Sequence, residues 1–206
     1  MSAKDIYTML RNEGMSEVGA LAMLGNMECE SSMRANNAQD SMQKCSDEEY
    51  TEVFNARPEE CYADGCGYGL CQWTHPARKR NLRQFAENWG VSVDAEDMQT
   101  EFAIYEMKTE YAQLWQYLCR TNNLYEATAK ICREYERPAV NNIAARYAAA
   151  QKYAYLAEKH EEEQDVCLYI MQAILAAMGY EVSITGKGDS KTAAALKKYT
   201  EKIGER

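Results

Sequence analysis

The sequence predicts a mainly α-helical protein with a large N-terminal domain and a small C-terminal domain. Its 206 residues include only three prolines and eleven glycines, and alanine, glutamate, lysine and methionine, which favour helices, are common. The first 160 residues contain no run that alternates apolar and polar side chains as a half-buried strand does. Near residue 160 a charge-dense run separates the main part of the chain from a short helical tail.

Capping residues set the boundaries of the first helices. Helices are expected over residues 2–13 and 16–31. Gly14 stops the first helix, and Ser16 can cap the second. Pro76 suits the first turn of a further helix, which ends at Gly90.

The remaining elements of the large domain are predicted less sharply. Residues 33–67 are expected to be irregular, with a short helix possible within 46–55. Two or three helices should fill residues 94–157, interrupted near Pro138 because proline does not continue a helix.

The run EKHEEEQD has no apolar anchor, so it is interpreted as a linker over about residues 158–164. The predicted domains are therefore 1–158 and 164–206. Two amphipathic stretches in the second domain, and its small size, predict a compact three-helix module.

Composition excludes several functional classes. A net charge of −9 argues against binding nucleic acid through its phosphates. No apolar run reaches the ~18 residues of a membrane span, so no membrane insertion is expected. The N-terminal residues lack the apolar core of a signal peptide, which predicts a protein that is not exported by that route.

The stretch GNMECESS, residues 25–32, raises the question of which carboxylate does chemistry. The second helix is apolar nearly all round, so it should be buried at the centre of its domain. Glu28 and Glu30 are two positions apart and point in different directions. Glu30 shares a narrow polar arc with Gly19 and Asn26, as expected for a helix side that faces a cleft. Partial burial and the negative end of the helix both favour a protonated Glu30, as a general acid requires.

A second motif, YGLCQWT at residues 68–74, combines glycines with aromatic and amide side chains. Glycine permits tight turns and the close approach of a ligand. Tyr68, Gln72 and Trp73 supply a stacking face and an amide, which suit a sugar.

Together, GNMECES and YGLCQWT resemble the lysozyme-like phage tail lysozyme and endolysin family. The resemblance continues through NNAQD, ARKRNLRQFA, MQTEF and YERPA, and it covers nearly all of residues 5–155. Cys29 and Cys71 replace alanines of the family pattern, a swap that small apolar side chains tolerate.

The resemblance implies that Glu30 is the catalytic acid and that the substrate is bacterial peptidoglycan. Cleavage would occur between N-acetylmuramic acid and N-acetylglucosamine, with Glu30 protonating the glycosidic oxygen. The same resemblance implies a glycan groove formed by six further residues: Asn37, Tyr68, Gln72, Trp73, Tyr135 and Glu136.

A second catalytic carboxylate is less evident in the sequence. Asp64, directly before the glycine-rich turn, is the first candidate and Asp40 the next. Each is also explained as a turn-forming aspartate. Without a second carboxylate, the substrate's own groups could assist, or a 1,6-anhydro product could form as in lytic transglycosylases.

Cysteine and histidine spacing does not favour a metal. Cys61, Cys66, Cys71 and His75 are spaced differently from the pairs typical of structural zinc. Free thiols are the leading interpretation, with a Cys61–Cys66 or Cys45–Cys61 disulfide after release from the cell as the alternative. We expect no metal or cofactor.

The basic side chains near the start of the helix expected at Pro76 have two explanations. Arg78, Lys79, Arg80 and Arg83 could meet anionic groups of the cell wall, or they could form an ordinary solvated helix face. The solvated face is the more common situation.

The tail resembles the peptidoglycan-binding module that follows many wall hydrolases. Matching positions include Gln172, Leu175, Gly179 and Leu196, whereas Thr185 and Asp189 depart from its pattern. A helical hairpin that only packs on the first domain is the alternative.

The combined prediction is an endolysin that waits in the host cytoplasm until lysis and then degrades the wall. Its alternatives are a lytic transglycosylase and a non-catalytic protein of wall binding or tail structure. The oligomeric state is not predicted.

Overall fold

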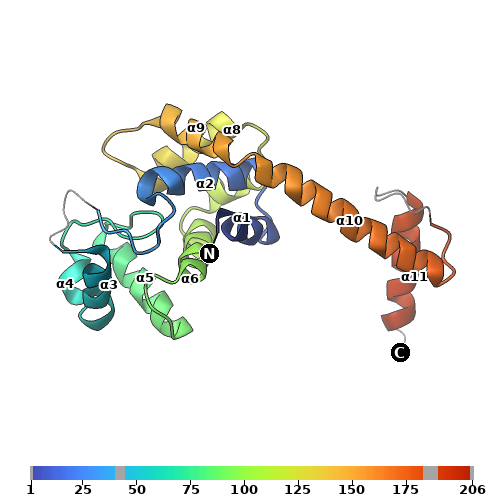
Figure 1. Ribbon diagram of the computed structural model, residues 1–206, viewed down its shortest axis with the longest axis horizontal. Coiled ribbons are helices and arrows are strands. Elements are labelled where there is room, and N and C mark those ends of the chain that lie inside the picture. The colour runs from blue at the N-terminus through green and yellow to red at the C-terminus, as the bar shows by residue number, and fades with distance from the viewer. Residues whose placement is uncertain (1, 40–44, 183–189, 205–206) are drawn as a thin grey trace. The chain divides into compact units, whose positions relative to one another are not determined.

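The computed structural model describes residues 2–39, 45–182 and 190–204, and these are mainly α-helical. The chain divides into two compact units, Met1–Ala154 and Tyr155–Arg206. The first unit contains the following helices (Figure 1): α1 (Ala3–Asn12), α2 (Glu17–Ser31), α3 (Asp47–Ala56), α4 (Glu59–Tyr62), α5 (Pro76–Trp89), α6 (Glu96–Thr109), α7 (Ala112–Leu118), α8 (Leu124–Lys130), the π-helix η1 (Ile131–Glu136) and α9 (Ile143–Lys152).

These bounds confirm the predicted class and the helices with strong caps. Ser2 and Ser16 cap α1 and α2 through their side chains, and Pro76 occupies the first turn of α5 before Gly90 ends it with a φ of 68°. Residues 94–157 hold more and shorter helices than expected. Asn123, for example, caps α8 with its side chain and so starts a new helix soon after α7.

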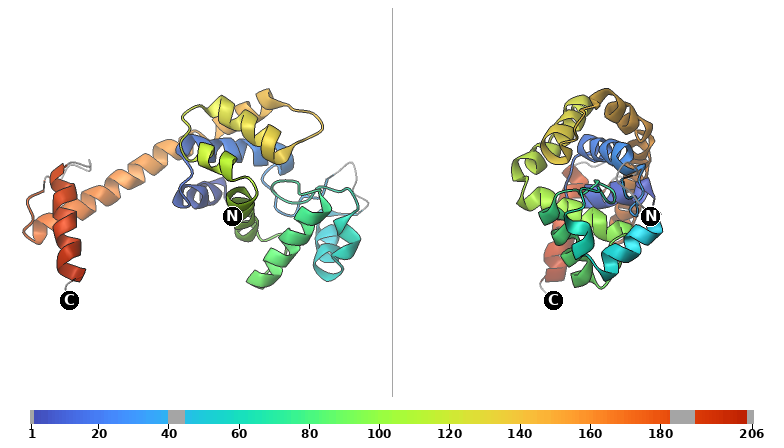
Figure 2. Two further views of the ribbon diagram at one scale, coloured as in Figure 1. Left: turned by 180° about the vertical axis from the view of Figure 1, so that it is seen from behind. Right: turned by 90° about the vertical axis from the view of Figure 1, so that its left-hand side faces the viewer.

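Helix α2 lies at the centre of the first unit, as its all-round apolar sequence predicts. It packs against α1, α8 and α9 (Figures 1 and 2), and its residues from Gly19 to Met27 are buried. Gly25 lets α9 approach closely. A Cβ at this position would lie 2.6 Å from the Ala150 Cβ and from the Arg146 carbonyl oxygen. The central position of α2 fixes the place at which its C-terminus, with Glu30, leaves the core.

The glycine-rich motif forms a tight turn that the rest of the unit holds from two sides. The Tyr68 and Trp73 backbones exchange hydrogen bonds, and the Gly69 amide donates to the Asn37 carbonyl at 2.9 Å. Gly69 has a φ of 77°, and a Cβ there would lie 2.5 Å from the Gln99 amide oxygen. That same oxygen accepts a hydrogen bond from the Leu70 amide. The turn therefore requires glycine and a buried amide from α6 beneath it.

The second unit contains α10 (Tyr155–Ala177) and α11 (Ser190–Gly204) within the described residues. The compact three-helix module stays a prediction. Gln172 on α10 donates to the Thr192 hydroxyl on α11 at 2.9 Å, and both side chains are buried. Thr185 and Asp189 lie outside the described residues.

The predicted linker at 158–164 lies inside α10. The unit boundary falls a few residues earlier, between Ala154 and Tyr155. Glutamate, lysine and glutamine are good helix formers, so a charged run without apolar anchors continues a helix here. None of the helices that the structure describes has the length and apolarity that a bilayer span needs.

The close approach of α2 and α9 predicts that Gly25→Ala destabilises the first unit. The added methyl group would overlap the α9 backbone, so the free energy of unfolding should fall by about 1–3 kcal/mol. Chemical denaturation followed by circular dichroism measures this change. Cys29→Ala, on the exposed side of the same helix, is the control and should stay near the wild-type value. Equal stability of the Gly25 variant would contradict the tight contact.

Candidate active site

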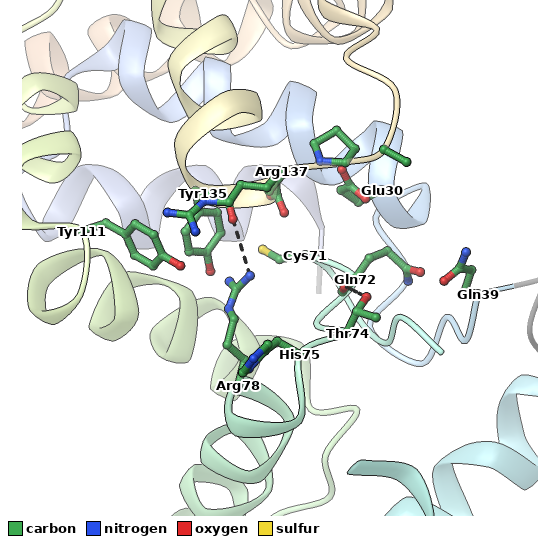
Figure 3. A pocket seen from close by; sticks show the side chains of 13 residues that line it. Glu30, Gln39, Cys71, Gln72, Thr74, His75, Arg78, Tyr111, Tyr135 and Arg137 are labelled. Atoms are coloured by element: carbon green, nitrogen blue, oxygen red, sulfur yellow. Dashed lines mark hydrogen bonds between the residues drawn. The ribbon is translucent and has the colours of Figure 1, made fainter. Parts of the chain in front are cut away.

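A cleft of about 880 Å³ opens in the first unit, beside the C-terminus of α2. Figure 3 shows Glu30, Tyr135 and Arg137 on one side of it and Gln72, Thr74 and His75 on the other. The following residues line it: Glu30, Gln39, Cys71, Gln72, Thr74, His75, Arg78, Tyr111, Tyr135, Glu136, Arg137, Pro138 and Ala139. The lining combines carboxylates, cations, amides and aromatic rings, as a polar sugar polymer would require.

Glu30 reaches the cleft from the last turn of α2, and its side chain is 15% exposed. Arg146 on α9 donates to Glu30 Oε1 at 2.5 Å and to Asn26 Oδ1 at 3.1 Å. Burial alone would lower the pKa of Arg146, but the charge of Glu30 and this hydrogen bond raise it overall. Asn26 and Glu30 thus share one face of α2, as the helical pattern predicts, and one cation binds both.

Glu136 lies at the end of the π-helix η1 and also lines the cleft. The next residue, Arg137, ends the helix in the left-handed region with a φ of 51°. Burial, and then the charge of Glu30, raise the pKa of Glu136 well above its usual value. Its Oε1 atom is buried with no hydrogen-bond partner among the described residues. Single π-helical turns are frequent at functional sites, because the wider turn redirects side chains.

A buried carboxylate on α6, Glu106, holds three lining or supporting residues in place. Its Oε2 atom accepts hydrogen bonds from Trp73 Nε1 at 2.8 Å, Arg78 Nη2 at 2.8 Å and the Tyr135 hydroxyl at 2.9 Å. Its Oε1 atom accepts from Arg78 Nε at 2.9 Å. The Arg78 guanidinium also lies 4.6 Å from the centre of the Tyr135 ring. Residues from the turn, α5 and η1 are therefore joined through one side chain.

Gln72 forms the opposite wall. Its backbone is held in the left-handed region with a φ of 45°, and its side-chain amide donates to the Asn37 and Gly69 carbonyl oxygens at 3.0 and 3.2 Å. The structure thus brings four of the predicted site residues together in the cleft: Glu30, Gln72, Tyr135 and Glu136.

Three predicted groove residues lie behind the wall instead of lining it. Tyr68 and Trp73 are fully buried, and Asn37 is 8% exposed. Tyr68 shares a 2.6 Å hydrogen bond with the Thr51 hydroxyl and stacks on Tyr50. Because they are buried, these side chains shape the wall and do not present a stacking face to a ligand.

Asp64 is not among the cleft-lining residues that the structure describes. Its Oδ1 atom accepts from Lys79 Nζ at 2.9 Å and from the Cys66 amide, and its Oδ2 atom accepts from the Tyr50 hydroxyl. These contacts support a structural role and give no support to the predicted catalytic one. Asp40, the second candidate, lies outside the described residues.

Lys79 departs from the expected solvated helix face, because its side chain is fully buried. Its ammonium group donates to Asp64, the Tyr50 hydroxyl and the Cys66 carbonyl, which satisfies all three of its protons. Arg78 lines the cleft but is held by Glu106. Arg78, Lys79 and Arg80 are consecutive, and the sequence pattern of this helix does not show which of the three side chains points into the core.

The sequence interpretation missed Arg146 and Glu106. Arg146 lies among alanines in IAARYAAAQK, whose other charge, Lys152, is at the helix end. A charged residue within a helix of small side chains could have been a signal of burial. Glu106 sits in an ordinary helical pattern and gives no such signal. Its partners lie 28 to 33 residues away in the chain.

No group of cysteine, histidine and carboxylate side chains suited to a metal occurs in the described part of the chain. The cysteines that the structure describes are free thiols, in agreement with the leading interpretation. Burial raises the pKa values of Cys61, Cys66 and Cys71, which keeps these thiols protonated and unreactive.

Comparison with protein families decides the assignment of the first unit. A model of phage tail lysozymes matches residues 1–156. The chain belongs to the phage tail lysozyme family. This membership confirms the lysozyme-like helical class and makes the chain a lysozyme-like, peptidoglycan-lytic enzyme. The match ends near the boundary at Ala154, so it concerns the first unit alone. Curated proteins give no match.

The contacts of Asp64 predict that Asp64→Asn in this lysozyme mainly costs stability. The fully buried Lys79 would lose its only anionic partner among the described residues, which should lower the free energy of unfolding by about 3 kcal/mol. Denaturation curves measure the loss of stability, and turbidity assays below the melting temperature measure any loss of activity. Glu60→Gln, at an exposed ion pair nearby, is the matched control. A loss of kcat of more than about a hundredfold at unchanged stability would instead give Asp64 a catalytic role.

Proposed function

We propose that the first unit cleaves the glycosidic bond between N-acetylmuramic acid and N-acetylglucosamine in peptidoglycan, with Glu30 as the general acid. The observation that supports this most directly is the position of Glu30. It ends the buried helix α2, is mostly shielded from water, and lines the cleft of the lysozyme-family unit. A partly buried carboxyl group at such a place can protonate a glycosidic oxygen as the bond breaks.

The opposite wall suits a glycan strand. Gln72 presents an amide, and Tyr111 adds aromatic surface to the cleft lining. The Tyr135 ring is buried beneath Arg78. Amides and aromatic faces bind the hydroxyl, acetamido and apolar faces of sugars. Asn37, Tyr68 and Trp73 support this wall from behind, so we assign them a role in its shape.

Two products follow from the same acid step. Attack by water on the sugar centre gives hydrolysis, whereas attack by the sugar's own 6-hydroxyl gives a 1,6-anhydro end. Mass spectrometry of the released muropeptides separates the two by the mass of one water molecule.

Glu30→Gln is expected to lower the lysis of purified cell walls by about a thousandfold, because the amide cannot donate a proton. The decrease in turbidity of a wall suspension measures the rate. Glu28→Gln is the matched control, since Glu28 accepts a hydrogen bond from Tyr153 and does not line the cleft among the described residues. Lysis by the Glu30 variant at the wild-type rate would refute the assignment, and a wild-type protein that binds walls without lysing them would indicate a non-catalytic role.

We further propose that the second unit binds the cell wall. Its sequence resembles wall-binding modules, and two of the matching residues, Gln172 and Leu175, are buried where α10 meets α11. The buried residues would hold the helices together, which leaves the exposed side chains free to bind the polymer.

Removal of residues 160–206 should weaken binding to insoluble peptidoglycan by about tenfold or more, since two linked binding sites hold a polymer more tightly than one. Co-sedimentation with purified walls measures the bound fraction. The same truncated chain should still cleave small soluble muropeptides, which one site can bind. Unchanged sedimentation would contradict a targeting role.

A further inference from the structure

The cleft holds two carboxyl groups whose surroundings differ in charge. Glu30 comes from α2 and Glu136 from η1, and both line the same cleft. Arg146 donates to Glu30, whereas Glu136 forms no ion pair or hydrogen bond through its buried Oε1 atom among the described residues. Glu30 thus has a cation bonded to it, whereas the buried oxygen of Glu136 has no such partner.

The other cation near Glu136 is already committed. Arg78 binds both oxygens of Glu106, so its charge is largely balanced there. A buried carboxylate oxygen without a donor is costly when the group is ionised. The same oxygen is tolerated when the group carries a proton. The geometry thus favours one negative charge, and not two, on the Glu30 and Glu136 side chains.

We propose that Glu30 and Glu136 act as one acid, a carboxyl pair that holds a single proton in the free enzyme while Arg146 balances the remaining charge. This proposal rests on the proposed glycosidase function of Glu30 and adds Glu136 as its partner. In coupled groups of this kind the proton belongs to the pair and not to either residue.

The proton balance of the reaction follows. As the glycosidic bond breaks, its electron pair goes to the leaving oxygen, which takes the single proton of the pair through Glu30. The pair is then doubly charged beside Arg146, and this charge faces the positive sugar centre that forms. Attack by water, or by the sugar's 6-hydroxyl, releases one proton, which restores the pair to its starting state.

The charges around the pair are consistent with this behaviour. Burial and Glu30 both raise the pKa of Glu136, which keeps a proton in the pair at neutral pH. The titratable and charged groups around the pair come from four elements and the turn: Arg78 on α5, Glu106 on α6, Tyr135 and Cys132 on η1, Arg146 on α9 and Cys71 in the turn. His75 and Arg137 line the same cleft.

The pH dependence of kcat on soluble muropeptides tests the pair. In Glu136→Gln the side chain at position 136 cannot carry a negative charge. Glu30 then loses its proton without repulsion from a neighbouring carboxylate. The alkaline limb of kcat should therefore move to lower pH by about one unit or more. The plateau of kcat at acidic pH should fall as well, because the variant lacks the second charge that faces the sugar centre. The position of the limb, and not the height of the plateau, tests the pair. Glu134→Gln, on the same π-helix and paired with Lys130, is the matched control and should leave the limb in place.

Arg146→Gln should move the alkaline limb in the opposite direction, to higher pH, because the cation that favours the charged pair is removed. Arg146 is buried, so circular dichroism must show that the variant is folded. Should it fail to fold, Glu136→Gln decides alone, since its Oε1 atom has no hydrogen bond to lose.

Two results would overturn the proposal. An unchanged limb in Glu136→Gln would show that Glu136 only shapes the cleft. A limb that moves to higher pH would show that no repulsion from Glu136 acts on the proton of Glu30. Failure of the underlying function is recognised separately, because Glu30→Gln would then retain lysis whatever the Glu136 variant does.

Discussion

The cleft depends on one buried carboxylate, Glu106. It is 3% exposed, and it accepts hydrogen bonds from a tryptophan in the turn, an arginine on α5 and a tyrosine on η1. A buried charge is tolerated only when it is paired and hydrogen-bonded, and Glu106 meets that condition with four donor contacts. Without it, Arg78 would be a shielded cation, and the turn and the π-helix would lose their common support.

Charges are balanced differently among the residues that line the cleft and the residues behind its wall. Behind the wall, Lys79 and Asp64 satisfy each other, and Arg78, which lines the cleft, is held by Glu106. At the front, Glu136 is left without a donor for its Oε1 atom within the described residues. Fully paired charges make a rigid frame, whereas a buried carboxyl oxygen without a donor favours the protonated group. Residues behind the wall therefore contribute to stability, whereas Glu136 in the cleft is placed for chemistry.

Much of the fold could be predicted from local signals. Serine caps, a proline in a first turn and an all-round apolar helix are encoded within a few residues, so α1, α2 and α5 follow from the sequence. The polar arc of α2 likewise singled out Glu30, and Arg146 contacts this arc at Asn26 and Glu30.

The pairings across the cleft could not be predicted in the same way. Arg146 and Glu30 are 116 residues apart, and no local pattern records such a contact. Aromatic and amide residues in one short motif look equally suited to a sugar, yet Gln72 faces the cleft while Tyr68 and Trp73 face the core. Which side chains of a tight turn point inward depends on the residues that pack beneath it, here Gln99 and Glu106.

A crystal structure of the Glu30→Gln variant with a bound muropeptide tests most directly whether Glu30 and Glu136 act on one bond. The expected result is a glycan strand that crosses the cleft, with the scissile oxygen within hydrogen-bond distance of the side chain at position 30 and Glu136 beside the same sugar. A strand bound elsewhere, or a scissile bond that contacts neither side chain, would contradict the assignment.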